Sequence, residues 1–151
     1  MAVDVSLIKQ LREKTGAGIA DCREALEATK NDLKGAEEFL AKKGFEKAAK
    51  KEGRETNSGL IDSYVHGGKV GVLVELLCET DFVARTDEYK TLAHEISLQV
   101  ASMKPKDVKA LEKQEYVRDP SKTIGDLVKE TIAKLGENIS IGRFERIELG
   151  K

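Results

Sequence analysis

The sequence has 151 residues, of which 40% are hydrophobic and 35% charged, which predicts one domain, or a small module attached to a modest core. Because 26 lysines and arginines oppose 27 aspartates and glutamates, the net charge of −1 indicates neither a polyacid nor a nucleic-acid binder. Cys22 and Cys78 lie far apart without a CxxC partner, which argues against a disulfide framework. The first residues lack the pattern of a signal peptide, and no apolar run is long enough to span a bilayer, so we expect a soluble, cytoplasmic protein.

Residue patterns that carry familiar catalytic chemistry are scarce. The two histidines, His66 and His94, belong to no metal-ligand motif, and no other side chains stand at ligand spacing. The phosphate-binding glycine patterns and the nucleophile elbow of hydrolases are absent as well. We therefore expect a protein that is not an enzyme, that holds no metal ion or other cofactor, and that works by contact with a partner.

Residues 1–50 predict a helical head of three short helices. The apolar stripes expected to face its interior are Leu7, Ile8 and Leu11, then Ile19, Cys22, Ala25 and Leu26, then Leu33, Ala36, Phe39 and Leu40. The sequence Thr15-Gly16-Ala17-Gly18 breaks the first helix, and Gly44 is expected to end the third as its C-cap. A bundle of this size buries little surface and is expected to be marginally stable alone.

A strongly basic stretch follows the predicted head. The range Lys42–Arg54 contains six basic and two acidic residues, a local charge of +4. We interpret it as a charged helical extension that leads into a linker, residues 51–58. An RNA-binding patch is the functional alternative, although no pair of aromatic side chains accompanies the charge for base stacking.

Residues 59–151 predict an α+β core that opens with a hairpin. Strand-like segments at Leu60–Val65 and Lys69–Cys78 are joined by His66-Gly67-Gly68, a sequence suited to the positive φ of a tight turn. The second strand is apolar on both faces, with the larger set formed by Val70, Val72, Val74 and Leu76. Helices are expected to cover one of these faces.

The rest of the core predicts two helices and a closing strand. Thr86 is expected to cap a helix that ends at Pro105 and buries a stripe of Tyr89, Leu92, Ile96, Val100 and Met103. Residues 106–120 are polar and predict no clear element. An amphipathic helix over residues 124–135 ends at Gly136, and Ile139–Leu149 reads as a strand with a bulge near Gly142. The fold class is α+β: a helical head, then a small antiparallel sheet with helices on one face.

Three ordered stretches carry a family resemblance. Residues 11–26 (LREKTGAGIADCREAL) and 75–85 (ELLCETDFVAR) resemble the two signatures of the bacterial elongation factor Ts family. The stretch DPSKTIG at residues 119–125, followed by GENI at residues 136–139, is similar to the closing part of that family's core. The similarity extends over nearly the whole chain in the right order.

This resemblance implies a guanine nucleotide exchange factor for elongation factor Tu. In that family the head is a three-helix bundle of the ubiquitin-associated type that docks on the partner, which assigns partner contacts to Arg12, Ile19 and Ala20. A loop of the core inserts beside the partner's Mg²⁺, and in this sequence it is formed by Thr80, Asp81, Phe82 and Val83. Gln99 stands where relatives place a histidine that contacts elongation factor Tu.

The residues themselves leave alternatives open. Without the resemblance, Phe82 reads as a core residue that caps the hairpin. A protein-binding adaptor that uses only its helical head is a second class of function, and an RNA- or ribosome-associated protein that uses Lys42–Arg54 is a third. Because the chain has one core module, the second apolar face of the sheet favours a homodimer through stacked sheets, as in short relatives. Each protomer is then expected to bind one elongation factor Tu. The alternative is a monomer whose head covers the sheet.

Overall fold

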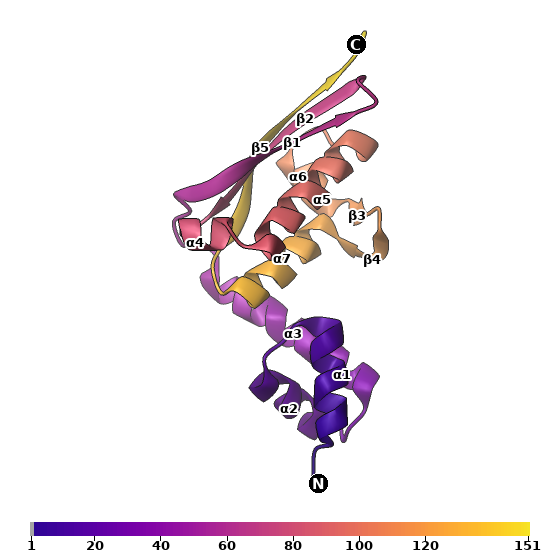
Figure 1. Ribbon diagram of the computed structural model, residues 1–151, viewed down its shortest axis with the longest axis vertical. Helices are drawn as coiled ribbons and strands as arrows, with labels where there is room; N and C mark the ends of the chain where they lie inside the picture. Colours follow the sequence, from indigo (N-terminus) through magenta and orange to yellow (C-terminus); the bar gives the residue numbers. More distant parts are fainter. Residues whose placement is uncertain (1) are drawn as a thin grey trace.

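Three helices form the amino-terminal end of the molecule (Figure 1), as seen in a computed structural model that describes residues 2–151. They are α1 (Val5–Thr15), α2 (Ile19–Ala28) and α3 (Leu33–Lys51). Gly16 has a left-handed φ of 72° and ends α1, as its place after the apolar stripe predicts. The helices enclose a small hydrophobic core of Leu11, Cys22, Ala25, Leu26 and Ala36. The prediction of three helices is confirmed, and Cys22 is buried as expected for an apolar face.

Helix α3 is longer than the sequence predicts. Gly44 does not end it; the helix continues to Lys51, and Ala48 is buried in the core of the α+β part. A Cβ atom at Gly44 would lie 3.3 Å from the Cβ of Ala133 in α7 (Ile124–Leu135). The glycine therefore allows two helices to approach closely, and α3 contributes residues to both hydrophobic cores.

A three-stranded antiparallel sheet forms the opposite end of the molecule. Its order is β1–β2–β5, with bounds Ser58–His66, Val70–Cys78 and Ile139–Glu148. Gly67 and Gly68 have φ values of 57° and 69°, which is the turn that the hairpin prediction requires. Glu75 pairs with Arg143 while Leu76 pairs with Ile141, so Gly142 is left over as the predicted bulge.

Helices cover only one face of this sheet (Figure 1). Helix α5 (Asp87–Met103) begins at its N-cap Thr86 and buries the predicted stripe Tyr89, Leu92, Ile96 and Val100. Met103 was expected in the same stripe but is half exposed, because it lies in the last turn beside the left-handed C-cap Lys104. With α7 also on this face, the α+β fold class is confirmed.

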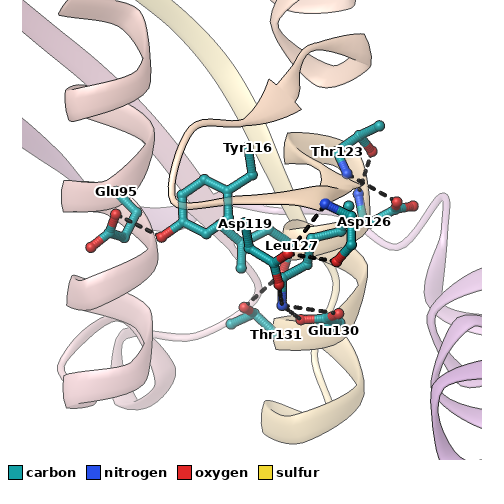
Figure 2. A network of polar contacts seen from close by, with 10 residues as sticks. Glu95, Tyr116, Asp119, Thr123, Asp126, Leu127, Glu130 and Thr131 are labelled. Atoms are coloured by element: carbon teal, nitrogen blue, oxygen red, sulfur yellow. Dashed lines mark hydrogen bonds and ion pairs between the residues drawn. The ribbon is translucent and has the colours of Figure 1, made fainter. Parts of the chain in front are cut away.

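The polar segment that predicted no clear element folds into a short helix and a small hairpin. They are α6 (Val108–Lys113), β3 (Glu115–Tyr116) and β4 (Asp119–Thr123). The phenol of Tyr116 donates to Glu95 at 2.7 Å, and Thr123 and Asp126 form a capping box at the start of α7 (Figure 2). Side chains from α5 and α7 thus hold a hairpin too short to be stable alone.

Gln99 is one of the residues that hold this hairpin. Its amide donates to the carbonyl of Glu115 at 3.0 Å and accepts from the backbone N–H of Val117, also at 3.0 Å. Only 1% of Gln99 is exposed. The position that the resemblance associates with a partner contact is therefore an interior position in this chain.

Candidate functional site

Residues 80–83 form the start of a single helical turn rather than an irregular loop. Thr80 is the N-cap of α4 (Asp81–Ala84), and its hydroxyl accepts from the backbone N–H of Val83 at 3.5 Å. Because consecutive residues of a helical turn point in different directions, Val83 and Ala84 are buried in the core while Phe82 is 77% exposed. The alternative in which Phe82 caps the hairpin as a core residue is thereby excluded.

Two glutamates hold the base of this turn. Glu137, in the connection between α7 and β5, accepts from the backbone N–H and the hydroxyl of Thr80 at 2.9 and 2.6 Å. Glu79, the residue after β2, accepts from the backbone N–H of Asn138 at 2.8 Å. We call Glu79, Thr80, Glu137 and Asn138 the carboxylate clasp. Hydrogen bonds to ionised carboxylates are about twice as strong as neutral ones, so α4 has a firm attachment.

A buried thiol and a buried phenol lie beneath the turn. Cys78 donates its S–H to the carbonyl of Thr80, with 3.1 Å between Sγ and oxygen, and the hydroxyl of Tyr89 donates to the carbonyl of Leu76 at 2.5 Å. Burial raises the pKa of the Cys78 thiol and, more strongly, the pKa of the Tyr89 phenol. Both groups therefore stay protonated at neutral pH, and they support the turn as hydrogen-bond donors.

The exposed side of α4 carries one charge pair beside the aromatic ring. Asp81 lies 2.9 Å from the guanidinium of Arg85, and both side chains are mostly exposed. An exposed pair of this kind is worth about 0–1 kcal/mol, so a partner can separate it at little cost. Asp81 and Phe82 are thus both available to a binding partner.

The head residues singled out by the resemblance lie on a second exposed surface. Arg12, Ile19 and Ala20 are all exposed, and Ile19 opens α2 with 58% of its surface accessible. The guanidinium Nε of Arg12 donates to the carbonyl of Ala17 at 3.4 Å, so the arginine packs against the turn that leads into α2. The turn faces the C-terminal end of α7, since a Cβ atom at Gly16 would lie 3.4 Å from the side chain of Lys134.

Within residues 2–151, no three histidine, cysteine, aspartate or glutamate side chains are grouped so that they could hold a metal ion. In the same range, no helix is both long and apolar enough to cross a membrane.

The sequence did not reveal the carboxylate clasp. Glu137 and Asn138 belong to the third similar stretch, but nothing in their spacing assigns them a role. They reach the turn because β5 pairs with β2 so that Ile139 lies opposite Cys78. The local signal is a glutamate one residue after β2 and another two residues before β5, and it has meaning only once the register of the two strands is known.

Comparison with known proteins gives consistent matches. A family model described as Elongation factor TS matches residues 79–151. The elongation factor Ts of Coprothermobacter proteolyticus is 45% identical over 197 aligned positions that cover both chains completely. Those of Thermotoga maritima and Desulfosudis oleivorans are 44% and 41% identical over 195 positions, which cover 98% of each relative. Because these alignments are longer than 151 residues, the relatives contain segments without a counterpart here.

Proposed function

Because this chain belongs to the elongation factor Ts family, a family of translation elongation factors, we propose that it releases GDP from elongation factor Tu. In this proposal α4 inserts beside the Mg²⁺ site of the partner. Of the four expected contact residues, Asp81 and Phe82 are exposed and touch the partner, whereas Thr80 and the buried Val83 hold them in place from below. The protein would act in the cytoplasm, where translation takes place. The partner is bound in its GDP form and, more tightly, without nucleotide.

The exposed ring of Phe82 is the observation that supports this mechanism most directly. A phenylalanine that is 77% exposed on a turn is unfavourable in water and gains free energy when it enters an apolar pocket. Buried aromatic anchors commonly dominate protein interfaces. The clasp and the buried Val83 hold the turn from below, so little conformational entropy is lost when the ring docks.

Exchange of this kind requires no covalent chemistry. A factor that binds nucleotide-free elongation factor Tu more tightly than the GDP form must weaken GDP binding by the same factor. Insertion of Phe82, together with a carboxylate at Asp81 near a site organised around Mg²⁺ and phosphate, supplies such a difference in affinity. Contact residues are therefore sufficient for the activity.

Stopped-flow release of fluorescent GDP from elongation factor Tu tests the role of Phe82. We expect Phe82→Ala to lower the efficiency of stimulated release roughly thirtyfold, since an anchor residue is typically worth about 2 kcal/mol or more. Val117→Ala removes a half-exposed apolar side chain outside α4 and serves as the control, which should exchange normally. Wild-type exchange by a folded Phe82→Ala variant would contradict the proposal. Binding without stimulated release by the wild-type chain would instead fit the adaptor function.

We also propose that the head adds affinity through Arg12, Ile19 and Ala20 while α4 performs the exchange. The head residues belong to α1 and α2 and the exchange residues to α4, so each set can be substituted without changing the other. We treat residues 1–50, 51–58 and 59–151 as head, linker and core in this division of labour. The continuous α3 supports a fixed orientation between head and core.

A homodimer through the uncovered sheet face completes the proposal. Ile61, Val65, Leu73 and Ile147 alternate with buried or partly buried positions on β1, β2 and β5, and each is at least half exposed. Figure 1 shows no helix over this side of the sheet. Two such faces stacked as a sandwich would bury these side chains, and a symmetric pair is the commonest arrangement of identical chains.

A further inference from the structure

The carboxylate clasp lies at the point where backbone pairing of β2 and β5 stops. The last paired residues are Cys78 and Ile139, and the amides of Thr80 and Asn138 lie just beyond. Each amide donates to the glutamate that precedes the other: Thr80 to Glu137, and Asn138 to Glu79. Two carboxylates thus extend the connection between the strands after the backbone ladder has ended.

Thr80 receives the stronger half of this reciprocal arrangement. Glu137 accepts both from its backbone N–H at 2.9 Å and from its hydroxyl at 2.6 Å. With the hydroxyl proton directed at Glu137, the oxygen lone pairs of Thr80 face the N–H of Val83 and cap α4. The carboxylate of Glu137 therefore fixes both the backbone and the side-chain orientation of the residue from which α4 starts.

The same network includes the segment that enters from α3. Arg54 lies 3.6 Å from Glu79, and its carbonyl accepts from the side-chain amide of Asn138 at 2.9 Å. The chain between α3 and β1 is thereby attached to the base of α4. Arg54 is more than half exposed, so Glu137 remains the main restraint on the turn.

We propose that Glu137 is a positioning residue that holds α4 in one orientation and so presents Phe82 to the partner. This inference rests on the exchange function proposed above. A purely structural role, in which the clasp only closes the end of the sheet, predicts a different result: removal of Glu137 would lower thermal stability but leave the order of α4 and the exchange reaction unchanged in the folded protein.

Backbone ¹⁵N relaxation of the free protein tests the restraint without any partner. We expect order parameters near about 0.85 for residues 81–84 in the wild type and below about 0.6 in Glu137→Ala. Glu137→Gln keeps one acceptor oxygen, so its order parameters should lie between those of the wild type and Glu137→Ala. This variant also allows the test to be made if Glu137→Ala does not fold. The matched control is Glu130→Ala, which removes a partly buried carboxylate of α7 that pairs with Lys122 (Figure 2).

Rigid order in residues 81–84 of the folded Glu137→Ala and Glu137→Gln variants would overturn the inference. Equal loss of order in Glu130→Ala would overturn it as well, because the effect would then be a general loosening of the core.

Exchange kinetics provide the second measurement. If α4 in Glu137→Ala spends about one-tenth of its time in the productive orientation, about tenfold more protein is needed for half-maximal GDP release, with the maximal rate retained. Normal exchange in Glu137→Ala, together with impaired exchange in Phe82→Ala, would overturn the positioning role and leave the proposed function intact. Normal exchange in Phe82→Ala would refute the proposed function itself, whatever the order parameters show.

Discussion

Asp21 shows how much of the basic stretch is neutralised within the chain. Its carboxylate accepts from Lys47 at 2.8 Å and from Lys43 at 3.0 Å, which joins α2 to α3. These two ammonium groups hold the pKa of Asp21 below its usual 3.8. Lys43 also binds Glu24, and its pKa is raised by Glu24 and then by Asp21. These pairs occupy two of the six cations in Lys42–Arg54, which weakens the RNA-binding interpretation.

The ion pairs of Asp21 should make the stability of the head depend on pH. A carboxyl group whose folded pKa is depressed contributes stability that is present above its unfolded pKa, near 3.8, and lost as the pH falls through the lower folded value. We expect Asp21→Asn to cost up to about 1 kcal/mol near pH 7, because the pairs are partly exposed, and much less near pH 2. Urea unfolding at both pH values measures the difference, and an equal cost at both would exclude a charge effect.

Helix α3 shows that tertiary packing can override a local signal at the level of an element. Glycine is common after the last turn of a helix, and it costs about 1 kcal/mol in a helix interior. At Gly44 the helix continues because the absent side chain lets α3 approach Ala133 of α7. Burial of Ala48 in the core beyond then stabilises the additional turns.

A larger side chain at position 44 should separate these two helices. We expect Gly44→Leu to destabilise the protein by about 1–3 kcal/mol, because even its Cβ atom would lie 3.3 Å from the Cβ of Ala133 and would force the two helices apart. Ala49→Leu places the same side chain at an exposed position of α3 and should be nearly neutral. Thermal unfolding of both variants measures the difference. A Gly44→Leu variant as stable as Ala49→Leu would show that the approach of α3 to α7 is not tight.

The whole molecule has two faces suited to contacts with other chains. The sheet presents apolar side chains on its uncovered face, and Ile19 is exposed at the start of α2, just after a turn that faces Lys134 of α7. A stable dimer interface of standard size buries about 1,200–2,000 Å² in total, so each chain would contribute about half of that area. Glu145 lies opposite Leu73 and Glu75 opposite Ile61 on the same face, so this face is apolar only in part.

Light scattering after size exclusion at micromolar concentration tests the homodimer. We expect the wild type to have twice the 16.6 kDa mass of one chain and Leu73→Glu to have the mass of a monomer. A glutamate in the centre of the sandwich would bury a charge without a partner, which is strongly unfavourable. Val117→Glu changes an exposed apolar residue outside the sheet and should remain dimeric. A wild-type mass near 16.6 kDa would reject the dimer.

The head should change affinity rather than the exchange step. We expect Ile19→Ser to raise the protein concentration needed for half-maximal GDP release about tenfold or more, while the maximal rate is retained. A tenfold change corresponds to an interface residue that contributes about 1.4 kcal/mol to binding. Titration of the variant in the stopped-flow assay separates the two quantities. An unchanged concentration dependence would remove Ile19 from the partner surface, and a lower maximal rate would contradict the proposed division between head and α4.

Features that depend on short stretches of sequence were predictable from the sequence alone. Glycine conformations at Gly67 and Gly16, the cap at Thr86 and the bulge at Gly142 depend on local backbone preferences, and the apolar stripes depend on helical periodicity. The family resemblance likewise located residues 80–83 as the candidate site. Unlike the resemblance, which extends over nearly the whole chain, the caps, turns and stripes are specified by neighbouring residues.

Only the tertiary structure decided what lies far apart in the sequence. The outward direction of Phe82 depends on which residues pack beneath α4, and the contact of Glu137 with Thr80 joins positions 57 residues apart. Burial of Gln99 requires the β3–β4 hairpin, and the full length of α3 requires Ala133 on another helix. Each of these features depends on a residue far away in the sequence, which local backbone preferences cannot specify. A buried polar group or a close approach of two helices is stable only when that distant residue is in place.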